Sequence, residues 1–426
     1  MKLPQLRVKD FLEHFSALEQ SKKLVRVSGR VLGIREMGSR LKFADLYSDG
    51  HQVQVMLDGE ELMMRGDIVQ VDGVAQMQKN ATIKCEKLRV LQECTARDLL
   101  PSRKTGLSDP HLRVEMRHVD LLYNSMNVFQ TRSRIIKDLR ERLHLEGFME
   151  VETPILSKEA GGALAEPFVT RVSSNGEELF MRIAPELWLK RCIVGGMERV
   201  FEIGKVFRNE GVDKTHQPEF TMCEFYWAYT ELEQVMQFVT DYISTNVMRL
   251  ESVERVDIVE EVERATNATG ICEMSQNALL ELVKTFEPTI YNTLPKHSLF
   301  DKLVAHYVEP KYANSAVFLM NHPLYSSPLA REHPSRRGQA ERFELFIKGM
   351  EVANGYVELA DADEQLRRVE AQAEENGRPV SRGDREYVEV LRFGLPPTVG
   401  CGLGVDRLVM LATAQKSIKH VILYPH

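Results

Sequence analysis

The chain has 426 residues, of which 43% are hydrophobic and 27% charged, and its formal net charge is −7 at pH 7. This composition is typical of a globular protein of two or three domains and excludes a disordered or fibrous chain, while the acidic balance argues against a protein that coats nucleic acid over its whole surface. No apolar run reaches the ~18 residues that a membrane span needs, and no cleavable signal opens the chain, so we expect neither membrane contact nor secretion.

The distribution of basic residues and of cysteines further limits the classes of protein that fit this sequence. Residues 1–42 contain ten Lys and Arg against four acids, a local balance of +6. A basic patch on an acidic protein suggests one local contact with a polyanion, and the alternative is an ordinary solvated face. The six cysteines are scattered without any Cys-x-x-Cys pair. Their spacing predicts reduced thiols rather than a disulfide framework or a zinc site.

The first hundred residues contain a series of short β-strand patterns separated by glycine-containing turns. Five strands within about 70 residues predict an OB-type barrel, a fold that often binds single-stranded nucleic acid, and we assign residues 1–100 to it. Phe43 lies among basic residues and is either a platform for base stacking or a core residue. The five predicted strands are 24–34, 40–46, 52–57, 68–75 and 82–91.

The rest of the chain predicts a second domain of mixed structure. Residues 101–126 are polar and rich in turn signals, which indicates a linker. Apolar positions at helical spacing follow in 127–147. Hairpin-like pairs at 197–229 and 342–359 then predict an antiparallel sheet flanked by helices, so we expect an α+β domain over 127–426.

Two glycine-containing segments superficially resemble phosphate-binding loops. Gly204 and Lys205 look like the end of a P-loop, but position 199 is Arg rather than the required glycine. The glycine-rich run 400–404 lies 22 residues from the C-terminus, which leaves no room for the βαβ unit of a dinucleotide site. It instead predicts a turn into a helix at Asp406 and Arg407, where the helix dipole and a guanidinium can face an anion; the alternative is a purely structural turn.

The hairpin at 197–229 carries the most specific pattern. Alternate residues of a strand share a face, so each strand-like run, 197–210 and 219–229, presents its charged and aromatic residues together. Such a face predicts a pocket wall, and the alternative is a solvated hairpin. The residues on it are Arg208, Glu210, Phe220, Glu224 and Tyr226, with His216 in the connecting loop.

These residues resemble a known motif. The segment from Phe207 to Tyr226 is similar to motif 2 of class II aminoacyl-tRNA synthetases, in the form found in lysyl-tRNA synthetases. Residues 147–154 (GFMEVETP) resemble motif 1, and residues 400–407 (GCGLGVDR) resemble motif 3. The resemblance implies an enzyme that uses ATP to activate lysine and then charges tRNA(Lys), with the α+β fold of that class. It also implies a homodimer formed through motif 1 and a cytoplasmic location.

The resemblance further implies an ATP site. Arg208 would contact the α-phosphate and the substrate carboxylate, and Arg407 would contact the γ-phosphate. Glu210 and His216 would hold the adenine side and the phosphate tail, while Phe220 would stack on adenine.

The same resemblance implies sites for a metal and for the amino acid. Glu344 and Glu351 would ligate Mg²⁺ that bridges the phosphates, although without the resemblance they would be ordinary edge-strand acids. The residues expected to surround lysine are Glu186, Glu224, Tyr226, Asn354, Tyr356 and Glu358.

Physical chemistry agrees with these roles. A lysine ammonium is compact and strongly hydrated, so a pocket that dehydrates it must supply anionic acceptors, for which Glu224 and Glu358 are the plausible pair, while Glu186 suits the α-ammonium. Unpaired acceptors would reject a neutral or acidic competitor. The amino-acid carboxylate is already ionised at neutral pH, so activation requires orientation and charge neutralisation rather than a catalytic base.

In the N-terminal barrel the resemblance implies an anticodon-binding surface. Phe43 would stack on an anticodon base, and Arg35 and Gln54 would make nearby contacts. Elsewhere the chain departs from the pattern: Glu166 stands where a basic residue is usual, which puts a phosphate or acceptor-end contact there in doubt, and Ala360 and Cys401 replace an asparagine and larger apolar residues.

Three alternatives remain open from the sequence. An aspartate or asparagine ligase of the same subgroup would need a cationic side-chain pocket, which Glu224 and Glu358 contradict. A paralogue that modifies a translation factor would lack the barrel. A catalytically silent tRNA-binding or signalling protein is disfavoured by the presence of Arg208, Glu344, Glu351 and Arg407.

Overall fold

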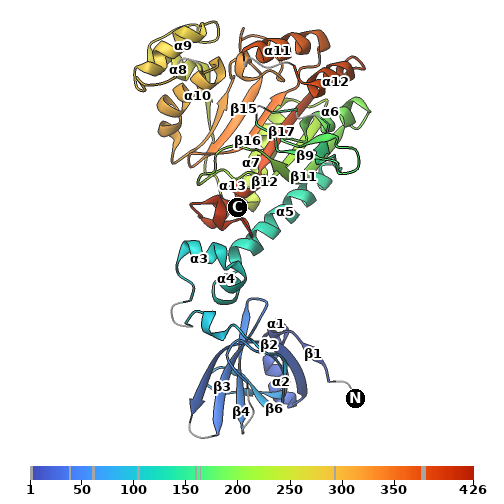
Figure 1. Cartoon of the computed structure of the whole chain (residues 1–426), viewed down its shortest axis with the longest axis vertical. Helices are drawn as coiled ribbons and strands as arrows, with labels where there is room; N and C mark the ends of the chain where they lie inside the picture. The colour runs from blue at the N-terminus through green and yellow to red at the C-terminus, as the bar shows by residue number, and fades with distance from the viewer. Residues whose placement is uncertain are drawn as a thin grey trace. The chain divides into compact units, whose positions relative to one another are not determined.

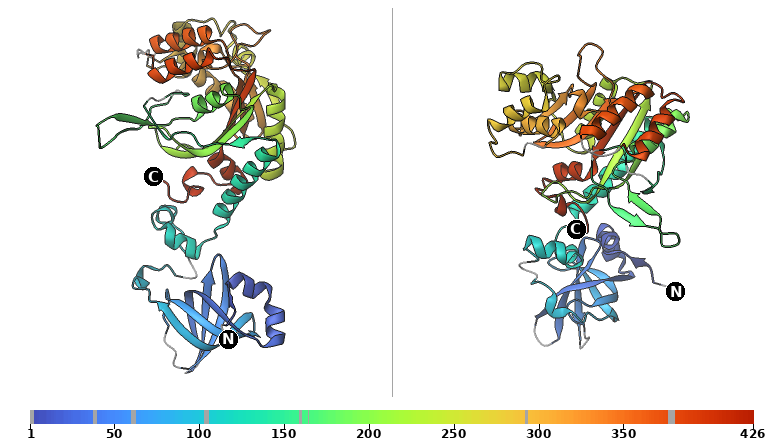
Figure 2. Two further views of the ribbon diagram at one scale, coloured as in Figure 1. Left: turned by 90° about the vertical axis from the view of Figure 1, so that its right-hand side faces the viewer. Right: turned by 45° about the horizontal axis from the view of Figure 1, so that its top comes forward.

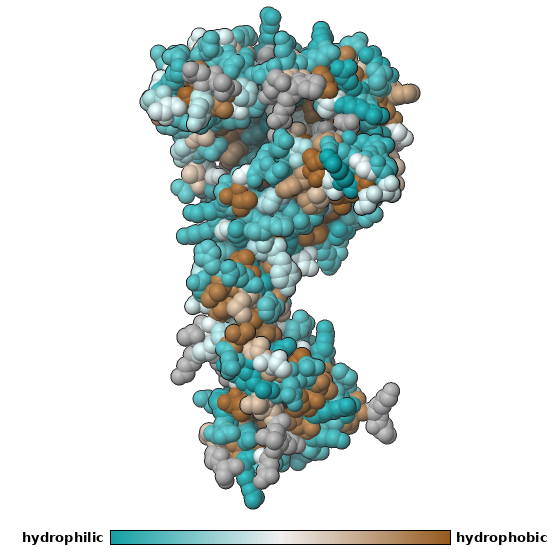
Figure 3. Space-filling model, in the orientation of Figure 1, coloured by the Kyte–Doolittle hydropathy of each residue, from teal (hydrophilic) through white to brown (hydrophobic). Residues whose placement is uncertain are grey.

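The computed structural model describes residues 3–37, 40–59, 63–102, 106–158, 161–163, 165–291, 294–375 and 380–426. The chain forms two compact units, Met1–Asn127 and Val128–His426 (Figures 1 and 2). In the view of Figure 3 the surface is largely hydrophilic, with apolar side chains scattered over it. None of the helices in the described ranges is long and apolar enough to cross a membrane.

The N-terminal unit is built on a six-stranded sheet with the order β1-β2-β3-β4-β6-β5. An additional antiparallel pairing between β2 and β5 closes this sheet into a barrel. The five strands predicted from the sequence are all present, and the expectation of an OB-type barrel is confirmed. The strands are β1 (Gln5–Leu6), β2 (Leu24–Met37), β3 (Leu41–Ser48), β4 (His51–Asp58), β5 (Ile68–Met77) and β6 (Ala81–Gln92).

Helices that the sequence analysis did not predict complete this unit. Helices α1 (Val8–Glu13) and α2 (Phe15–Ser21) add Phe11 and Phe15 to the barrel core. The segment expected to be a linker contains α3 (Pro110–Glu115) and α4 (Arg117–Tyr123), after a short 3-10 turn at Arg97–Leu99. Asp109 caps α3 by accepting hydrogen bonds from two backbone N–H groups, so this segment is ordered by local signals that a turn-rich composition conceals.

The C-terminal unit contains an eight-stranded sheet with the order β13-β14-β15-β16-β17-β12-β11-β7. Its central pairings are antiparallel, and only the edge pairs β7–β11 and β13–β14 are parallel among the described strands. The predicted α+β architecture is therefore confirmed. The strands are β7 (Met149–Glu150), β11 (Arg199–Phe207), β12 (Glu219–Ala228), β13 (Glu254–Asp257), β14 (Ala316–Met320), β15 (Arg342–Ile347), β16 (Met350–Val357) and β17 (Thr398–Gly404).

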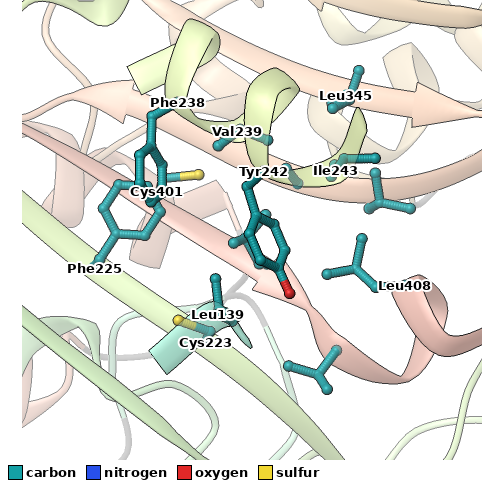
Figure 4. Close-up of a cluster of buried hydrophobic side chains, with 14 of the residues drawn as sticks. Leu139, Cys223, Phe225, Phe238, Val239, Tyr242, Ile243, Leu345, Cys401 and Leu408 are labelled. Carbon is teal, nitrogen blue, oxygen red and sulfur yellow. The ribbon is translucent and has the colours of Figure 1, made fainter. Parts of the chain in front are cut away.

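One face of this sheet is covered by α5 (Asn127–Leu145), α7 (Leu232–Asn246) and α13 (Val405–Thr413). Figure 4 shows α7 side chains such as Tyr242 packed against Cys223, Phe225 and Cys401 of the central strands. The buried Tyr242 hydroxyl donates a hydrogen bond to the Ile135 carbonyl at 2.9 Å. Because alternate strand residues fill this core, the residues between them face the opposite side of the sheet.

Two groups of helices lie beside that opposite face. One group, α6 (Glu186–Val194) and α12 (Arg382–Leu391), packs against β11 and β12. The other comprises α8 (Ile258–Thr266), α9 (Gln276–Lys284) and α10 (Lys296–Tyr307). Helix α11 (Ala362–Glu375) follows α10 and precedes α12 in the sequence. A small sheet of β8 (Leu156–Ser157), β9 (Val169–Arg171) and β10 (Glu178–Met181) carries a hairpin that projects from the unit in Figure 2.

Candidate active site

A cavity of about 980 Å³ opens on the face of the large sheet that α7 does not cover, and side chains of β12, β16, β17 and α10 contribute to its wall. Its floor follows from strand register. Strand β17 lies between β12 and β16, with Gly400 between Tyr226 and Tyr356, and Gly402 between Glu224 and Asn354. Glycines at alternate positions leave an open channel between two rows of side chains.

Gly400 is required by space rather than by backbone conformation. A Cβ atom there would lie 2.3 Å from Glu358 Oε1 and 2.5 Å from the Tyr226 ring. The alternate residues Cys401 and Leu403 point to the other face and are buried in the core. The glycine spacing that resembled motif 3 therefore shapes the cavity floor, and the strand passes directly into α13 at Gly404.

One end of the cavity is anionic and closed to solvent. Glu186, Glu224 and Tyr226 are 6%, 5% and 3% exposed. The Tyr226 hydroxyl donates to Glu224 Oε2 at 3.0 Å, and the Tyr356 hydroxyl donates to Glu186 Oε1 at 2.6 Å. Burial, reinforced by repulsion from Glu186, raises the pKa of Glu224 to about 8. A cation bound beside Glu224 would therefore stabilise the ionised form of its carboxyl group.

Lys190 is a buried charged residue beside the cavity that the sequence analysis did not single out. It is 0% exposed, and its ammonium contacts Glu186 Oε1 and Glu358 Oε2. Burial alone would lower the pKa of Lys190, but the two carboxylates raise it, so this ammonium is charged. A detectable signal was present, because Lys190 interrupts an apolar helix four residues after Glu186, the spacing of an ion pair.

The structure places five of the six residues expected around lysine on the cavity wall: Glu186, Glu224, Tyr226, Asn354 and Tyr356. Glu358 differs, since its side chain is fully buried behind the wall, against Lys190. Of the expected pair, Glu224 lies on the cavity wall, while Glu358 is buried against Lys190 on the cavity side of Gly400.

The other end of the cavity is cationic and more exposed. Arg208 and Arg407 both line it, with Glu210, His216 and Phe220. The Arg208 guanidinium lies 5.3 Å from the centre of the Phe220 ring. Arg407 donates to the Glu351 carbonyl at 2.8 Å, and its Nη2 lies 3.1 Å from His216 Nε2.

One expectation about this end was wrong. The first strand of the hairpin ends at Phe207, so Arg208 and Glu210 extend from the connecting segment rather than from a strand face. The ladder stops because Pro218, opposite Arg208, has no N–H to donate, although its carbonyl still accepts from the Arg208 N–H at 2.9 Å. Phe220, Glu224 and Tyr226 do share one face of β12, as predicted.

Within the loop, Asp213 organises His216. Its Oδ1 accepts from the backbone N–H groups of Thr215 at 2.6 Å and of His216 at 2.8 Å, while Oδ2 lies 2.8 Å from His216 Nδ1. The Thr215 N–H and the neighbouring donors hold the pKa of Asp213 well below its usual range. A carboxylate on Nδ1 leaves Nε2 directed towards Arg407.

Glu344 and Glu351 lie on the hairpin of β15 and β16, which turns at Lys348 and Gly349 with positive φ angles of 50° and 73°. Burial would raise the pKa of Glu344, but His322 and Arg342 beside it lower that pKa to about 2. Burial and the charge of Glu344 raise the pKa of Glu351. Two carboxylates on the cavity wall are the hard oxygen donors that suit Mg²⁺. Within the described ranges, no three His, Cys, Asp or Glu residues form a metal cluster by themselves.

In the N-terminal unit, Arg35, Phe43 and Gln54 lie on neighbouring strands, with Arg35 paired to Phe43 in register. Residues Ala44 and Val55 next to them are buried in the barrel, so these three side chains face outward. Arg35 lies 3.3 Å from Asp45, and Gln54 accepts from Thr82 at 3.1 Å. Phe43 is only partly buried, so its ring is not part of the hydrophobic core.

In comparison with known proteins, residues 109–426 match the family described as tRNA synthetases class II (D, K and N). The chain belongs to this family. The synthetase is 36% identical to a probable cytoplasmic lysine–tRNA ligase of Enterocytozoon bieneusi, over 97% of this chain and 89% of that protein.

Relatives from other lineages are equally similar. A lysine–tRNA ligase of Saccharolobus solfataricus is 36% identical, over 94% of the synthetase and 87% of that protein. One of Neisseria meningitidis is 37% identical, over 94% of the synthetase and 86% of that protein. The similarity therefore includes the barrel as well as the family's catalytic segment.

Proposed function

We propose that this synthetase is a lysine–tRNA ligase that forms lysyl-adenylate from lysine and ATP and transfers the lysyl group to tRNA(Lys). The observation that carries the proposal is a single cavity with buried glutamates at one end and two arginines at the other. One end suits a dicationic amino acid, and the other suits a triphosphate. The relatives named as lysine–tRNA ligases support the same choice over an aspartate or asparagine ligase.

Lysine recognition follows from the anionic end. Glu186 binds the α-ammonium, and Glu224 with the Tyr226 hydroxyl receives the side-chain ammonium, to which the buried Glu358 also contributes. Tyr356 and Asn354 form the facing wall. A neutral or acidic amino acid would leave these buried carboxylates unpaired, and a site built from such acceptors discriminates by about 10⁴ or more.

Activation takes place where the two ends meet. The lysine carboxylate attacks the α-phosphorus, the bond to the bridging oxygen breaks, and pyrophosphate leaves. Arg208 orients the carboxylate and the α-phosphate, Phe220 stacks on adenine, and Arg407 holds the γ-phosphate with His216 and Glu210 nearby. The attacking group is already ionised at neutral pH, so orientation and charge neutralisation supply the catalysis.

Glu344 and Glu351 would hold Mg²⁺, which neutralises phosphate charge when it is bound. Their placement at the phosphate end of the cavity fits this role. Arg342 contacts Glu344, and Arg407 lies 3.2 Å from Glu351 Oε2, so both carboxylates are held in place by arginines.

Transfer and tRNA selection require the rest of the chain. The terminal ribose hydroxyl of tRNA attacks the carbonyl carbon of lysyl-adenylate, its proton is released, and AMP leaves. We assign anticodon recognition to the barrel, residues 1–100, through Phe43, Arg35 and Gln54. Catalysis belongs to residues 127–426, and 101–126 connect the two.

The enzyme is a homodimer of the cytoplasm in this proposal. Support for the dimer comes from exposed apolar side chains around the segment that resembles motif 1: Leu145 is 81% exposed, Met149 56% and Ile155 45%. Residues of this kind mark contact surfaces when they gather on one region. Sedimentation analysis of the full chain tests the dimer, and a monomer at micromolar concentration would contradict it.

Amino-acid-dependent ATP–pyrophosphate exchange tests the central proposal. The assay needs no tRNA and is run with all twenty amino acids. We expect exchange with lysine alone. Exchange with aspartate or asparagine, or no exchange with any amino acid, would remove the proposed function.

The barrel assignment has its own test. Phe43→Ala should slow aminoacylation of tRNA about tenfold or more, since loss of one base stack costs about 1–3 kcal/mol. It should leave lysine-dependent exchange unchanged, because that reaction needs no anticodon. Equal loss of both activities would contradict the assignment.

A further inference from the structure

Lys190 presents an arrangement that the proposed mechanism does not use. Its α6 neighbours Leu187, Leu189 and Ile193 are buried in an apolar cluster, and no part of Lys190 reaches solvent. An ammonium in such a place must find fixed partners. It finds two carboxylates, Glu186 and Glu358, which come from positions 172 residues apart in the chain.

Aromatic rings complete the enclosure of this ammonium. Its nitrogen lies 5.4 Å from the ring centre of Tyr356, 5.5 Å from that of Tyr387 and 6.0 Å from that of Tyr226. Distances up to about 6 Å allow cation–π attraction. Two of these tyrosines also line the cavity, so the internal ammonium and the substrate site share a wall.

Each glutamate gives Lys190 only one of its oxygens. Lys190 and the Tyr356 hydroxyl both contact Oε1 of Glu186, which leaves Oε2 for a ligand. Lys190 contacts Oε2 of Glu358, and Oε1 has no hydrogen-bond partner among the described residues. That second oxygen lies directly over Gly400, where an added Cβ would be 2.3 Å away.

We propose that Lys190 is a positioning residue for amino-acid specificity: it binds one oxygen of Glu186 and one of Glu358 and thereby directs the other two towards the ammonium groups of the substrate. This inference rests on the proposed function and extends it to a residue outside the cavity wall. Burial raises the pKa values of Glu224 and Glu358, and the charge of Lys190 opposes that rise at both carboxyls.

The test compares Lys190→Met with a matched control, Lys284→Met, which removes a lysine paired to Glu281 on α9 away from the cavity. Lysine-dependent exchange and calorimetric titration with lysine are measured on the full-length protein. For Lys190→Met we expect the KM and Kd for lysine to rise at least about tenfold, with the KM for ATP within about twofold of wild type. The control should match the wild type in all of them.

A double variant keeps the test valid if Lys190→Met folds poorly. Lys190→Met combined with Glu358→Gln removes one positive and one negative charge from the buried cluster, so we expect it to fold. If Lys190 acts through Glu358, the double variant should bind lysine within about threefold of Glu358→Gln alone, because the two effects are not additive. Additive losses would overturn the proposal.

The remaining outcomes separate this inference from the function on which it rests. Wild-type exchange with lysine, together with an unchanged lysine KM in Lys190→Met, would refute the role of Lys190 and leave the function intact. A parallel rise in the KM values for lysine and ATP would show a purely structural role and would also refute it. Absence of lysine-dependent exchange in the wild type would remove both.

Discussion

The two ends of the cavity differ in charge and in exposure to solvent. At the anionic end Glu186, Glu224 and Lys190 are almost completely buried, and one oxygen of each glutamate accepts a hydrogen bond from a tyrosine hydroxyl. At the cationic end the side chains of His216 and Asp213 are 54% and 58% exposed, and the guanidinium of Arg407 contacts Glu351 and His216. Selectivity for a small cation requires a dry, preorganised site, whereas a polyanion is captured by arginines that are charged at any pH.

We expect the largest loss of activity from a side chain added at Gly400, in the cavity floor at the buried end. Gly400→Ala places a methyl group within 2.5 Å of Glu358 and Tyr226, so we expect kcat/KM for lysine to fall by about 10³-fold or more, equivalent to about 4 kcal/mol. Gly402→Ala is the matched comparison, because its Cβ would lie 3.2 Å from the flexible end of Met222 and at ordinary contact distances, 3.7 Å or more, from Glu224 and Asn354. Equal losses from both would show that the floor does not discriminate between these positions.

Removing the charge of Glu224 should produce the next largest effect. Glu224→Gln keeps the shape but supplies a neutral acceptor, so we expect the KM for lysine to rise about 100-fold, in line with ~3 kcal/mol for a hydrogen bond to a charged group. The KM for ATP should not change, because the phosphate end is separate. Steady-state exchange kinetics measure both, and a matching rise in the ATP value would contradict the division of the cavity.

The pH dependence of lysine binding should sharpen the same comparison. With the site empty, Glu224 has a pKa of about 8 and is mostly protonated at pH 7. Lysine favours the ionised form, so binding releases a proton and the affinity should increase with pH, by up to about tenfold per unit, until it levels off above pH 8. Calorimetry in buffers of different ionisation enthalpy measures the released proton. Glu224→Gln should abolish that slope, and a slope retained in the variant would assign it elsewhere.

The smallest effect should come from the exposed end. Asp213→Ala frees His216 from its oriented position, and we expect the KM for ATP to rise about threefold to tenfold, equivalent to about 0.7–1.4 kcal/mol for a solvent-exposed contact. The KM for lysine should not move. Asp109→Ala, which removes a capping aspartate from α3, serves as the control. An effect on lysine larger than on ATP would reverse the proposed assignment of the two ends.

Sequence reasoning succeeded where a pattern is local. Alternation over 219–228 correctly placed Phe220, Glu224 and Tyr226 on one face, and glycine-bounded runs located all five barrel strands. It failed at boundaries set by a partner strand, because β11 ends where Pro218 can no longer donate. It also missed α1 and α2, whose short amphipathic runs are stabilised mainly by packing on the barrel.

The sequence by itself determined the family, the barrel and the hairpins, because short-range periodicity and motif spacing can be recognised along the chain. Only the tertiary structure decided that Glu358 is buried beside Gly400 and that Lys190 is its partner. The physical reason is that the ionisation and direction of a buried carboxylate depend on which distant charges share its low-dielectric surroundings, and those neighbours are selected by the packing of α6 against β11 and β12 rather than by any local pattern.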